Sequence, residues 1–120
     1  MAVGGLTGHC HCGDVAVRVP RRPDMIAHCN CSLCTAVGWR GIYFRPDEIE
    51  MDGTFDRYRR TDIKKPMIDL FRCKRCGMAT HWTLLNEPPH ERMGINANLF
   101  APEVLSGIEV VESDGRNWER

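Results

Sequence analysis

Short stretches of alternating apolar and polar residues run along most of the chain, the pattern of a β-sheet protein. Residues 14–19, DVAVRV, place valine at every second position, which predicts a strand with one buried face. Comparable stretches predict further strands over residues 25–28, 41–44, 49–51, 55–60, 67–73, 78–84, 93–99 and 108–112. We therefore expect a mainly β fold of short antiparallel strands.

Turn-forming residues separate these stretches. Arg21–Asp24 is expected to be a turn, and the Asp52-Gly53 pair is a strong hairpin signal. Residues 35–38 predict a turn or brief helix, residues 86–90 a loop, and residues 102–106 a single helical turn opened by proline. There is no repeat, low-complexity tract or flexible linker, so residues 1–120 are expected to form a single domain.

Composition narrows the class of protein. The chain has 120 residues, of which 42% are hydrophobic and 27% charged, ordinary values for one globular domain. There is no apolar run near the roughly 18 residues of a membrane helix. Residues 1–13 carry neither the basic cluster nor the apolar stretch of a secretory signal, which favours a cytoplasmic protein. Sixteen basic and 16 acidic residues balance, which argues against nucleic acid or a membrane surface as partner.

Seven cysteines, an odd number, occur in three clusters. They are Cys10 and Cys12, then Cys29, Cys31 and Cys34, and last Cys73 and Cys76. An odd count without an export signal argues against a disulfide framework. Thiolates one or two residues apart on tight turns can share one tetrahedral zinc at about 2.3 Å. Gly13 and Gly77 directly follow two of the clusters and would let the backbone fold tightly around a metal. We therefore expect zinc.

Two assignments of these thiols to metals are open. A conventional zinc ribbon would join Cys31 and Cys34 to the last pair and leave three cysteines scattered. The other assignment joins the first and last pairs and leaves the middle three as a local group. We favour the second because it uses every thiol, giving one closed four-ligand site and one three-ligand site with an open position.

Four segments carry a resemblance to a known family. They are GHCHCG at residues 8–13, HCNCSLC at 28–34, FRCKRCG at 71–77 and THW at 80–82, with Gly53 and Tyr58 between them. This order resembles the glutathione-dependent formaldehyde-activating enzyme (GFA) family, which also contains the centromere protein V group. The resemblance implies an Mss4-like zinc-binding fold. It also implies two zinc ions, a structural one on Cys10, Cys12, Cys73 and Cys76 and a catalytic one on Cys29, Cys31 and Cys34.

An open three-thiolate site suits thiol chemistry. A free thiol of pKa about 8.5 is only about 3% ionised at pH 7, whereas a zinc-bound thiol is deprotonated. Our hypothesis is that a small thiol binds there and adds to an aldehyde carbon, so that a carbon–sulfur bond forms or is cleaved. The resemblance implies glutathione and formaldehyde, the activity of an S-(hydroxymethyl)glutathione synthase or carbon–sulfur lyase. The alternative is a non-catalytic, zinc-stabilised protein-interaction module; a nucleic-acid zinc finger is disfavoured by the neutral charge.

Histidines are secondary candidates at the open site. His28 and His81 are candidates for a resting fourth ligand or a proton shuttle, although a core or surface role is the commoner fate of such residues. His9, His11 and His90 are expected to be spectators.

Cationic and aromatic residues are candidates for binding the organic part of the ligand. The carboxylates of glutathione require a cationic partner, for which the candidates are Arg40, Arg45, Arg57, Arg59, Arg60, Lys64 and Lys65. A run of this kind is more often a solvated edge that prevents strand pairing. Trp39, Tyr43 and Trp82 are expected to form pocket walls or to pack in the core. Exposed strand edges would also permit a homodimer.

Overall fold

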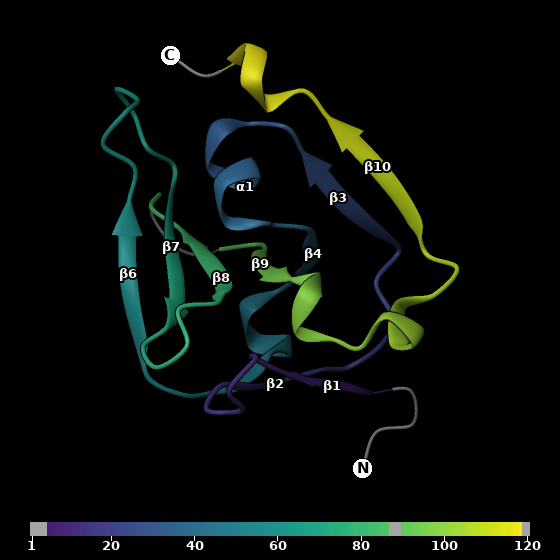
Figure 1. Ribbon diagram of the computed structural model, residues 1–120. Helices are drawn as coiled ribbons and strands as arrows, with labels where there is room; N and C mark the ends of the chain where they lie inside the picture. Colours follow the sequence, from purple (N-terminus) through teal and green to yellow (C-terminus); the bar gives the residue numbers. More distant parts are fainter. Residues whose placement is uncertain (1–4, 87–89, 119–120) are drawn as a thin grey trace.

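Two β-sheets and one short α-helix make up the described part of the chain (Figure 1). The computed structural model describes residues 5–86 and 90–118. The smaller sheet has the order β1-β2-β5, with strands Leu6–His9, Ala16–Val19 and Glu50–Asp52. The larger sheet has the order β10-β3-β4-β9-β8-β7-β6. Its strands are β3 (Met25–Cys29), β4 (Gly41–Phe44), β6 (Phe55–Arg59), β7 (Ile68–Cys73), β8 (Ala79–Leu84), β9 (Met93–Asn96) and β10 (Glu109–Ser113).

Strand pairing is antiparallel at each described junction except one, where β10 runs parallel to β3. The helix α1 spans Ser32–Val37, and 3-10 turns occupy Pro46–Glu48, Ala97–Leu99, Pro102–Leu105 and Gly115–Trp118. No helix among the described residues has the length and apolar character needed to cross a membrane. The predicted mainly β, Mss4-like fold is confirmed.

The main core lies between the two sheets. Along the second strand Val17 and Val19 are buried while Ala16 and Arg18 are exposed, which is the alternation that the sequence predicts. These valines belong to one cluster with Ile42 of β4 and Ile95 of β9, both fully buried. Burial of this apolar face holds the small sheet against the large one.

A second hydrophobic cluster covers the opposite face of the large sheet. Trp39, Leu70 and Trp82 are buried in it, and Leu33 and Cys34 of α1 pack against them. Neighbouring residues of a strand point to opposite faces. Cys34 therefore lies beside this second cluster. The cysteines that lie beside the main core are Cys10, Cys12, Cys73 and Cys76.

Three local predictions are corrected by the structure. Asp52-Gly53 forms a turn but no hairpin, because β5 pairs with β2 whereas β6 pairs with β7. The strand expected over residues 93–99 ends at Asn96, whose side chain accepts a 3.1 Å hydrogen bond from the Asn98 amide and starts a 3-10 turn. The brief helix expected at residues 35–38 begins earlier, at Ser32. The loop expected at residues 86–90 falls partly outside the described residues.

Candidate metal centres

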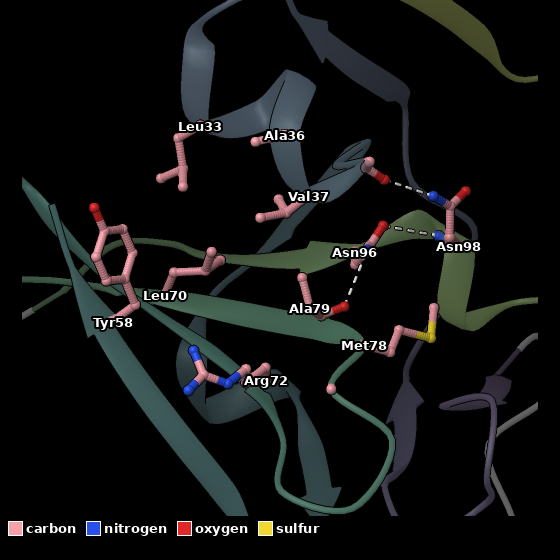
Figure 2. Close-up of a pocket in the computed structure, with 12 residues that line it drawn as sticks. Leu33, Ala36, Val37, Tyr58, Leu70, Arg72, Met78, Ala79, Asn96 and Asn98 are labelled. Atoms are coloured by element: carbon pink, nitrogen blue, oxygen red, sulfur yellow. Dashed lines mark hydrogen bonds between the residues drawn. The ribbon is translucent and has the colours of Figure 1, made fainter.

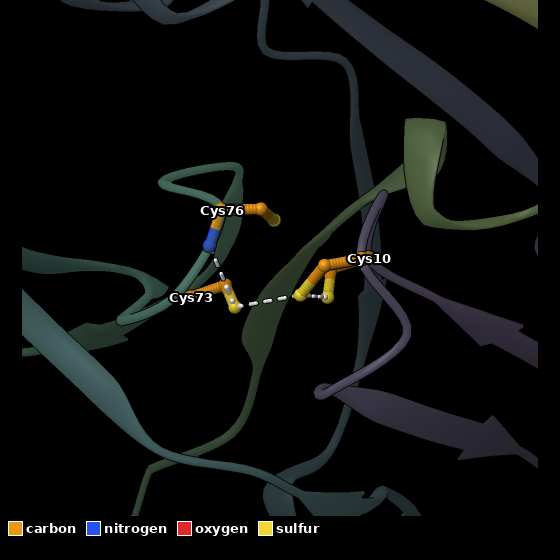
Figure 3. Close-up of side chains that lie close together, drawn as sticks. Cys10, Cys73 and Cys76 are labelled. Atoms are coloured by element: carbon orange, nitrogen blue, oxygen red, sulfur yellow. Dashed lines mark hydrogen bonds between the residues drawn. The ribbon is translucent and has the colours of Figure 1, made fainter.

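Cys10, Cys12, Cys73 and Cys76 form a four-cysteine group, brought together from two distant turns. Their sulfur atoms all lie within 4.8 Å of one another. Cys10 Sγ lies 3.6 Å from Cys12 Sγ, which lies 3.7 Å from Cys73 Sγ although 61 residues separate those two cysteines. In Figure 3 the turn that carries Cys10 faces the β7–β8 hairpin that carries Cys73 and Cys76. The group therefore joins the small sheet to the large one.

Each of the two turns is folded in the same way. The Gly13 amide donates to the Cys10 carbonyl at 3.1 Å, and the Gly77 amide donates to the Cys73 carbonyl at 2.9 Å. Both glycines have left-handed backbones, with φ of 88° and 79°, a conformation that glycine adopts without strain. Here the two glycines have the conformational role expected from the sequence.

Backbone amides also point at the sulfur atoms. Val15 N donates to Cys10 Sγ at 3.2 Å, and Cys76 N donates to Cys73 Sγ at 3.4 Å. Amides of Met78 and Cys12 lower the pKa of Cys76 to about 6. The Cys76 thiol is therefore readily available as a thiolate, the form that binds a metal. The Asp14 amide lowers the pKa of Cys12, but burial and the neighbouring sulfurs outweigh it and raise that pKa to about 12, a repulsion that a bound cation would offset.

The spacing of these sulfurs fits a tetrahedral metal site. Four sulfurs at about 2.3 Å from a central zinc would lie about 3.8 Å from one another, close to the observed 3.6 and 3.7 Å. A disulfide would need about 2.05 Å, and all seven cysteines are free. The four-cysteine group can therefore hold a metal ion with no further ligand.

Cys29, Cys31 and Cys34 form a three-cysteine group, built at the junction of β3 and α1. Their sulfurs also lie within 4.8 Å of one another. Cys29 ends β3, and Cys31 is the N-cap of α1, its Sγ accepting a 3.3 Å hydrogen bond from the Cys34 amide. The helix cap thereby brings these two sulfurs onto one turn. The structure thus groups the sulfurs as four and three, and it does not form the ribbon pairing of Cys31 and Cys34 with Cys73 and Cys76.

The three thiols have different environments. Burial raises the pKa of Cys34, and the neighbouring sulfurs of Cys31 and Cys29 raise it further. Burial also disfavours the Cys29 thiolate, but hydrogen bonds, among them those from the amides of Cys31 and Gly115, outweigh it and leave the pKa of Cys29 below its usual value. A bound cation would offset the mutual repulsion of three thiolates, so the three-cysteine group can also hold a metal ion.

A cavity of about 550 Å³ lies beside the three-cysteine group. Besides the three cysteines, it is lined by Leu33, Arg60, Ile63, Lys64, Lys65, Met67, Ile68 and Gly115. Arg60 donates to Ser32 Oγ of α1 at 3.0 Å and pairs with Asp62 at 2.7 Å. Within the described residues neither Lys64 nor Lys65 has an ion-pair partner. The cavity therefore combines sulfur donors, aliphatic walls and two lysines that are available to an anion.

The remaining arginines of the basic run serve the fold. Arg59 donates to both carboxylate oxygens of Asp69, at 2.8 and 3.0 Å, and Arg57 donates to the same group at 3.5 Å. Asp69 is buried, and Arg59 lowers its pKa. Arg40 binds Asn98 and Arg45 pairs with nearby acidic groups, and neither lines the cavity. Of the predicted cationic candidates, the structure brings Arg60, Lys64 and Lys65 to the thiols.

The rings of the candidate histidines contact groups other than the sulfurs. His81 is buried, its ring stacked on Phe71 with centroids 4.6 Å apart and Phe55 edge-on at 4.9 Å. Burial lowers the pKa of His81 to about 4. His28 is half exposed and binds Glu112 at 2.8 Å. Neither residue belongs to a described group that could hold a metal.

The predicted aromatic residues pack in the second cluster instead of lining the cavity beside the thiols. Trp39 and Trp82 are 5% and 8% exposed, and Tyr43 packs beside Trp82 with centroids 5.8 Å apart. The residues that do line this cavity and that the sequence analysis missed are Leu33, Ile63, Met67, Ile68 and Gly115. Leu33 directly precedes Cys34, so its position in the sequence was the available signal. The other four gave no local signal, because they approach the thiols only through tertiary packing.

A larger cavity, of about 750 Å³, lies between α1 and the large sheet (Figure 2). Tyr58, Leu70 and Arg72 line it from the sheet, while Val37 lines it from the helix. It contains no cysteine and shares only Leu33 with the cavity beside the thiols. The chemistry of the thiols therefore belongs to the smaller cavity.

Fold and sites together define a β-rich protein with two cysteine groups, each able to hold a metal ion. The model of the glutathione-dependent formaldehyde-activating enzyme family matches residues 5–108, and the chain belongs to that family. A crystal structure of a Rhodobacter sphaeroides protein, a structural genomics target, has the same fold, with a TM-score of 0.63 and 21% identity over 88% of this chain and 100% of that one. A search of curated proteins found no match.

Proposed function

We propose that the protein is a zinc-dependent carbon–sulfur lyase that forms or cleaves S-(hydroxymethyl)glutathione. The observation that carries this proposal is the convergence of Cys29, Cys31 and Cys34 beside a cavity lined by two lysines that have no ion-pair partner in the described part of the chain. Membership of the family supports glutathione as the thiol and formaldehyde as the aldehyde.

Two zinc ions are proposed, with different roles. Cys10, Cys12, Cys73 and Cys76 would hold a structural ion, since four sulfurs at tetrahedral spacing leave no free position. Cys29, Cys31 and Cys34 would hold a second ion with one position open to a ligand. When bound there, zinc would supply the charge that keeps an incoming thiol deprotonated at neutral pH.

The reaction is an addition in one direction and an elimination in the other. The glutathione sulfur forms a bond to the carbonyl carbon of formaldehyde, the C=O π electrons move to oxygen, and the proton released by the thiol reaches that oxygen. Lys64 and Lys65, which line the cavity, would bind the carboxylates of glutathione. Leu33, Ile63 and Ile68 form the aliphatic part of the cavity wall.

The wider setting proposed for this activity follows from the same residues. Seven free cysteines suit a reducing cytoplasm, where thiols persist. We propose that residues 1–120 act as one domain, on small molecules and without nucleic acid or membrane. The exposed edge strand β10 would allow a homodimer.

The experiment is exchange spectroscopy with isotopically labelled formaldehyde and glutathione. Thiols add to formaldehyde without a catalyst, so the measured quantity is the exchange rate above the protein-free rate. We expect acceleration by the zinc-loaded protein and its loss in Cys34→Ser. Equal rates with and without the wild-type protein would refute catalysis and favour the alternative, a zinc-stabilised interaction module.

A second measurement tests the lysines. In the doubly substituted protein Lys64→Ala with Lys65→Ala we expect the dissociation constant of glutathione to rise about five-fold, corresponding to about 1 kcal/mol for two solvent-accessible ion pairs. Lys74→Ala is the matched control, because Lys74 is exposed and lies outside the cavity. An unchanged dissociation constant in the double variant would contradict carboxylate binding by these lysines.

A further inference from the structure

The last described segment of the chain reaches the three-cysteine group. The family model matches residues 5–108, so β10 and the turn at Gly115–Trp118 follow the matched part. We call residues 109–118 the C-terminal arm. Figure 1 shows β10 running beside β3, with the terminal turn above α1. The parallel register pairs Ser113 with Cys29, so the arm ends its strand beside the first cysteine of the group.

Asn30, which lies between two cysteines of the group, holds the arm through four hydrogen bonds. Its side-chain nitrogen donates to Asp114 Oδ1 at 2.8 Å, and its side-chain oxygen accepts from the Arg116 amide at 3.0 Å. Its backbone carbonyl accepts from Arg116 Nε at 3.0 Å, and its amide donates to the Ser113 carbonyl at 3.1 Å. The positions of the arm and of the cysteine loop are therefore coupled.

Gly115 is the point at which the arm touches the thiols. The residue lines the cavity together with Cys29 and Cys31. A β-carbon at this position would lie 2.5 Å from Cys29 Sγ and 3.1 Å from Cys31 Cβ. Gly115 is not among the glycines with positive φ. Contact with the sulfur, not backbone conformation, is therefore what requires glycine here.

We propose that the C-terminal arm completes the three-cysteine site, with Gly115 as a positioning residue whose backbone packs against Cys29 Sγ and holds it in place. The inference rests on the proposed function, because it assumes that this group binds a metal and a thiol. The groups that surround metal ligands orient those ligands, and substitution of such groups typically lowers metal affinity 10- to 100-fold.

The test uses cobalt(II), whose absorption reports sulfur coordination. Cobalt is titrated into the full-length protein, and the spectrum of Cys34→Ser is subtracted to isolate the three-cysteine group. In Gly115→Ala we expect cobalt affinity at this group to fall about ten-fold, with an altered absorption band, while the signal of the four-cysteine group is retained. Ser113→Ala is the control, because it changes an exposed side chain of the same arm.

A second pair of variants tests the coupling through Asn30. Asn30→Asp places a carboxylate against Asp114 and removes the donor between them, so cobalt affinity should fall. In the double variant Asn30→Asp with Asp114→Asn, the amide at position 114 can donate to the carboxylate at position 30, and the net charge equals that of the wild type. The cobalt affinity should therefore recover. Recovery supports positioning by the arm, because general damage to the fold would not be reversed by a second substitution.

The outcomes separate this inference from the proposed function. If the wild-type protein binds no cobalt at the three-cysteine group, or if glutathione leaves its spectrum unchanged, both are refuted. If the wild type binds and responds but Gly115→Ala and Asn30→Asp match it in affinity and spectrum, only the role of the arm is refuted. Loss of affinity in both variants with recovery in the exchanged pair supports the inference.

Discussion

His81 is a buried histidine that lies outside both cysteine groups, and its protonation should weaken the fold. Its Nδ1 lies 2.9 Å from Thr80 Oγ1, and that hydroxyl donates its own proton to the Phe71 carbonyl. Nδ1 is therefore the ring nitrogen that carries hydrogen. A second proton would place a charge between two phenylalanine rings in a buried site, which is unfavourable.

The size and sign of the effect follow from the pKa. Burial lowers the pKa of His81 from 6.5 to about 4, so the unfolded chain binds more protons than the folded one between these pH values. The free energy of unfolding therefore falls as the pH falls from 6.5 to 4. At about 1.4 kcal/mol per pKa unit, the loss is about 3 kcal/mol.

The assay is urea denaturation of the zinc-loaded protein between pH 7 and 5.5, comparing the wild type with His81→Phe, because stronger acid protonates thiolate ligands and releases zinc. Both proteins have the same seven cysteines, so protonation of thiols cancels in the difference between them. We expect the wild type to lose about 1 kcal/mol more than the variant between pH 7 and 5.5. His28→Gln, which removes an exposed histidine, should retain the wild-type loss. Parallel pH dependences for the wild type and His81→Phe would refute the reasoning.

Three further outcomes are expected. Complete chelation of metal, or Cys73→Ser, should abolish cooperative thermal unfolding. The reason is that binding of structural zinc contributes about 10–16 kcal/mol, as much as the whole free energy of unfolding of a typical domain. A cooperative transition in the metal-free protein would contradict this. Asp69→Asn should lower the free energy of unfolding, measured by urea denaturation, by about 1–3 kcal/mol. The reason is that Arg59 donates to both oxygens of the buried Asp69 carboxylate, and the substitution removes that charged partner. A decrease below 0.5 kcal/mol would contradict this. Gly94→Ala would place a β-carbon 2.1 Å from Trp82 Nε1 and should shift tryptophan fluorescence and lower the melting temperature, whereas an unchanged spectrum would count against this packing.

Much of the fold could be predicted because burial alternates along individual strands. Val17 and Val19 indicated the buried face of β2, and the glycines that follow the cysteines, Gly13 and Gly77, indicated both turns of the four-cysteine group. The paired spacing of the cysteines also indicated a division into four and three, which is how the structure groups the sulfurs.

Local sequence patterns could not predict which distant segments pair with one another. Asp52-Gly53 is a turn signal, but it does not indicate that β5 pairs with β2 in the small sheet and not with β6. Gly115 carries no local signal, since it meets Cys29 only through a parallel pairing of strands more than 80 residues apart. His81 was a reasonable ligand candidate by sequence, yet its strand points it at Phe71 and not at any thiol.

The four-cysteine group fastens the two sheets together, whereas the three-cysteine group packs against the cluster on the far face of the large sheet. If both hold zinc as proposed, architecture and reactivity depend on separate ions. A cell short of zinc would then keep the protein folded for as long as the tighter, fully enclosed ion remained. The reaction would be lost first, and the intact scaffold could regain it when the metal supply returned.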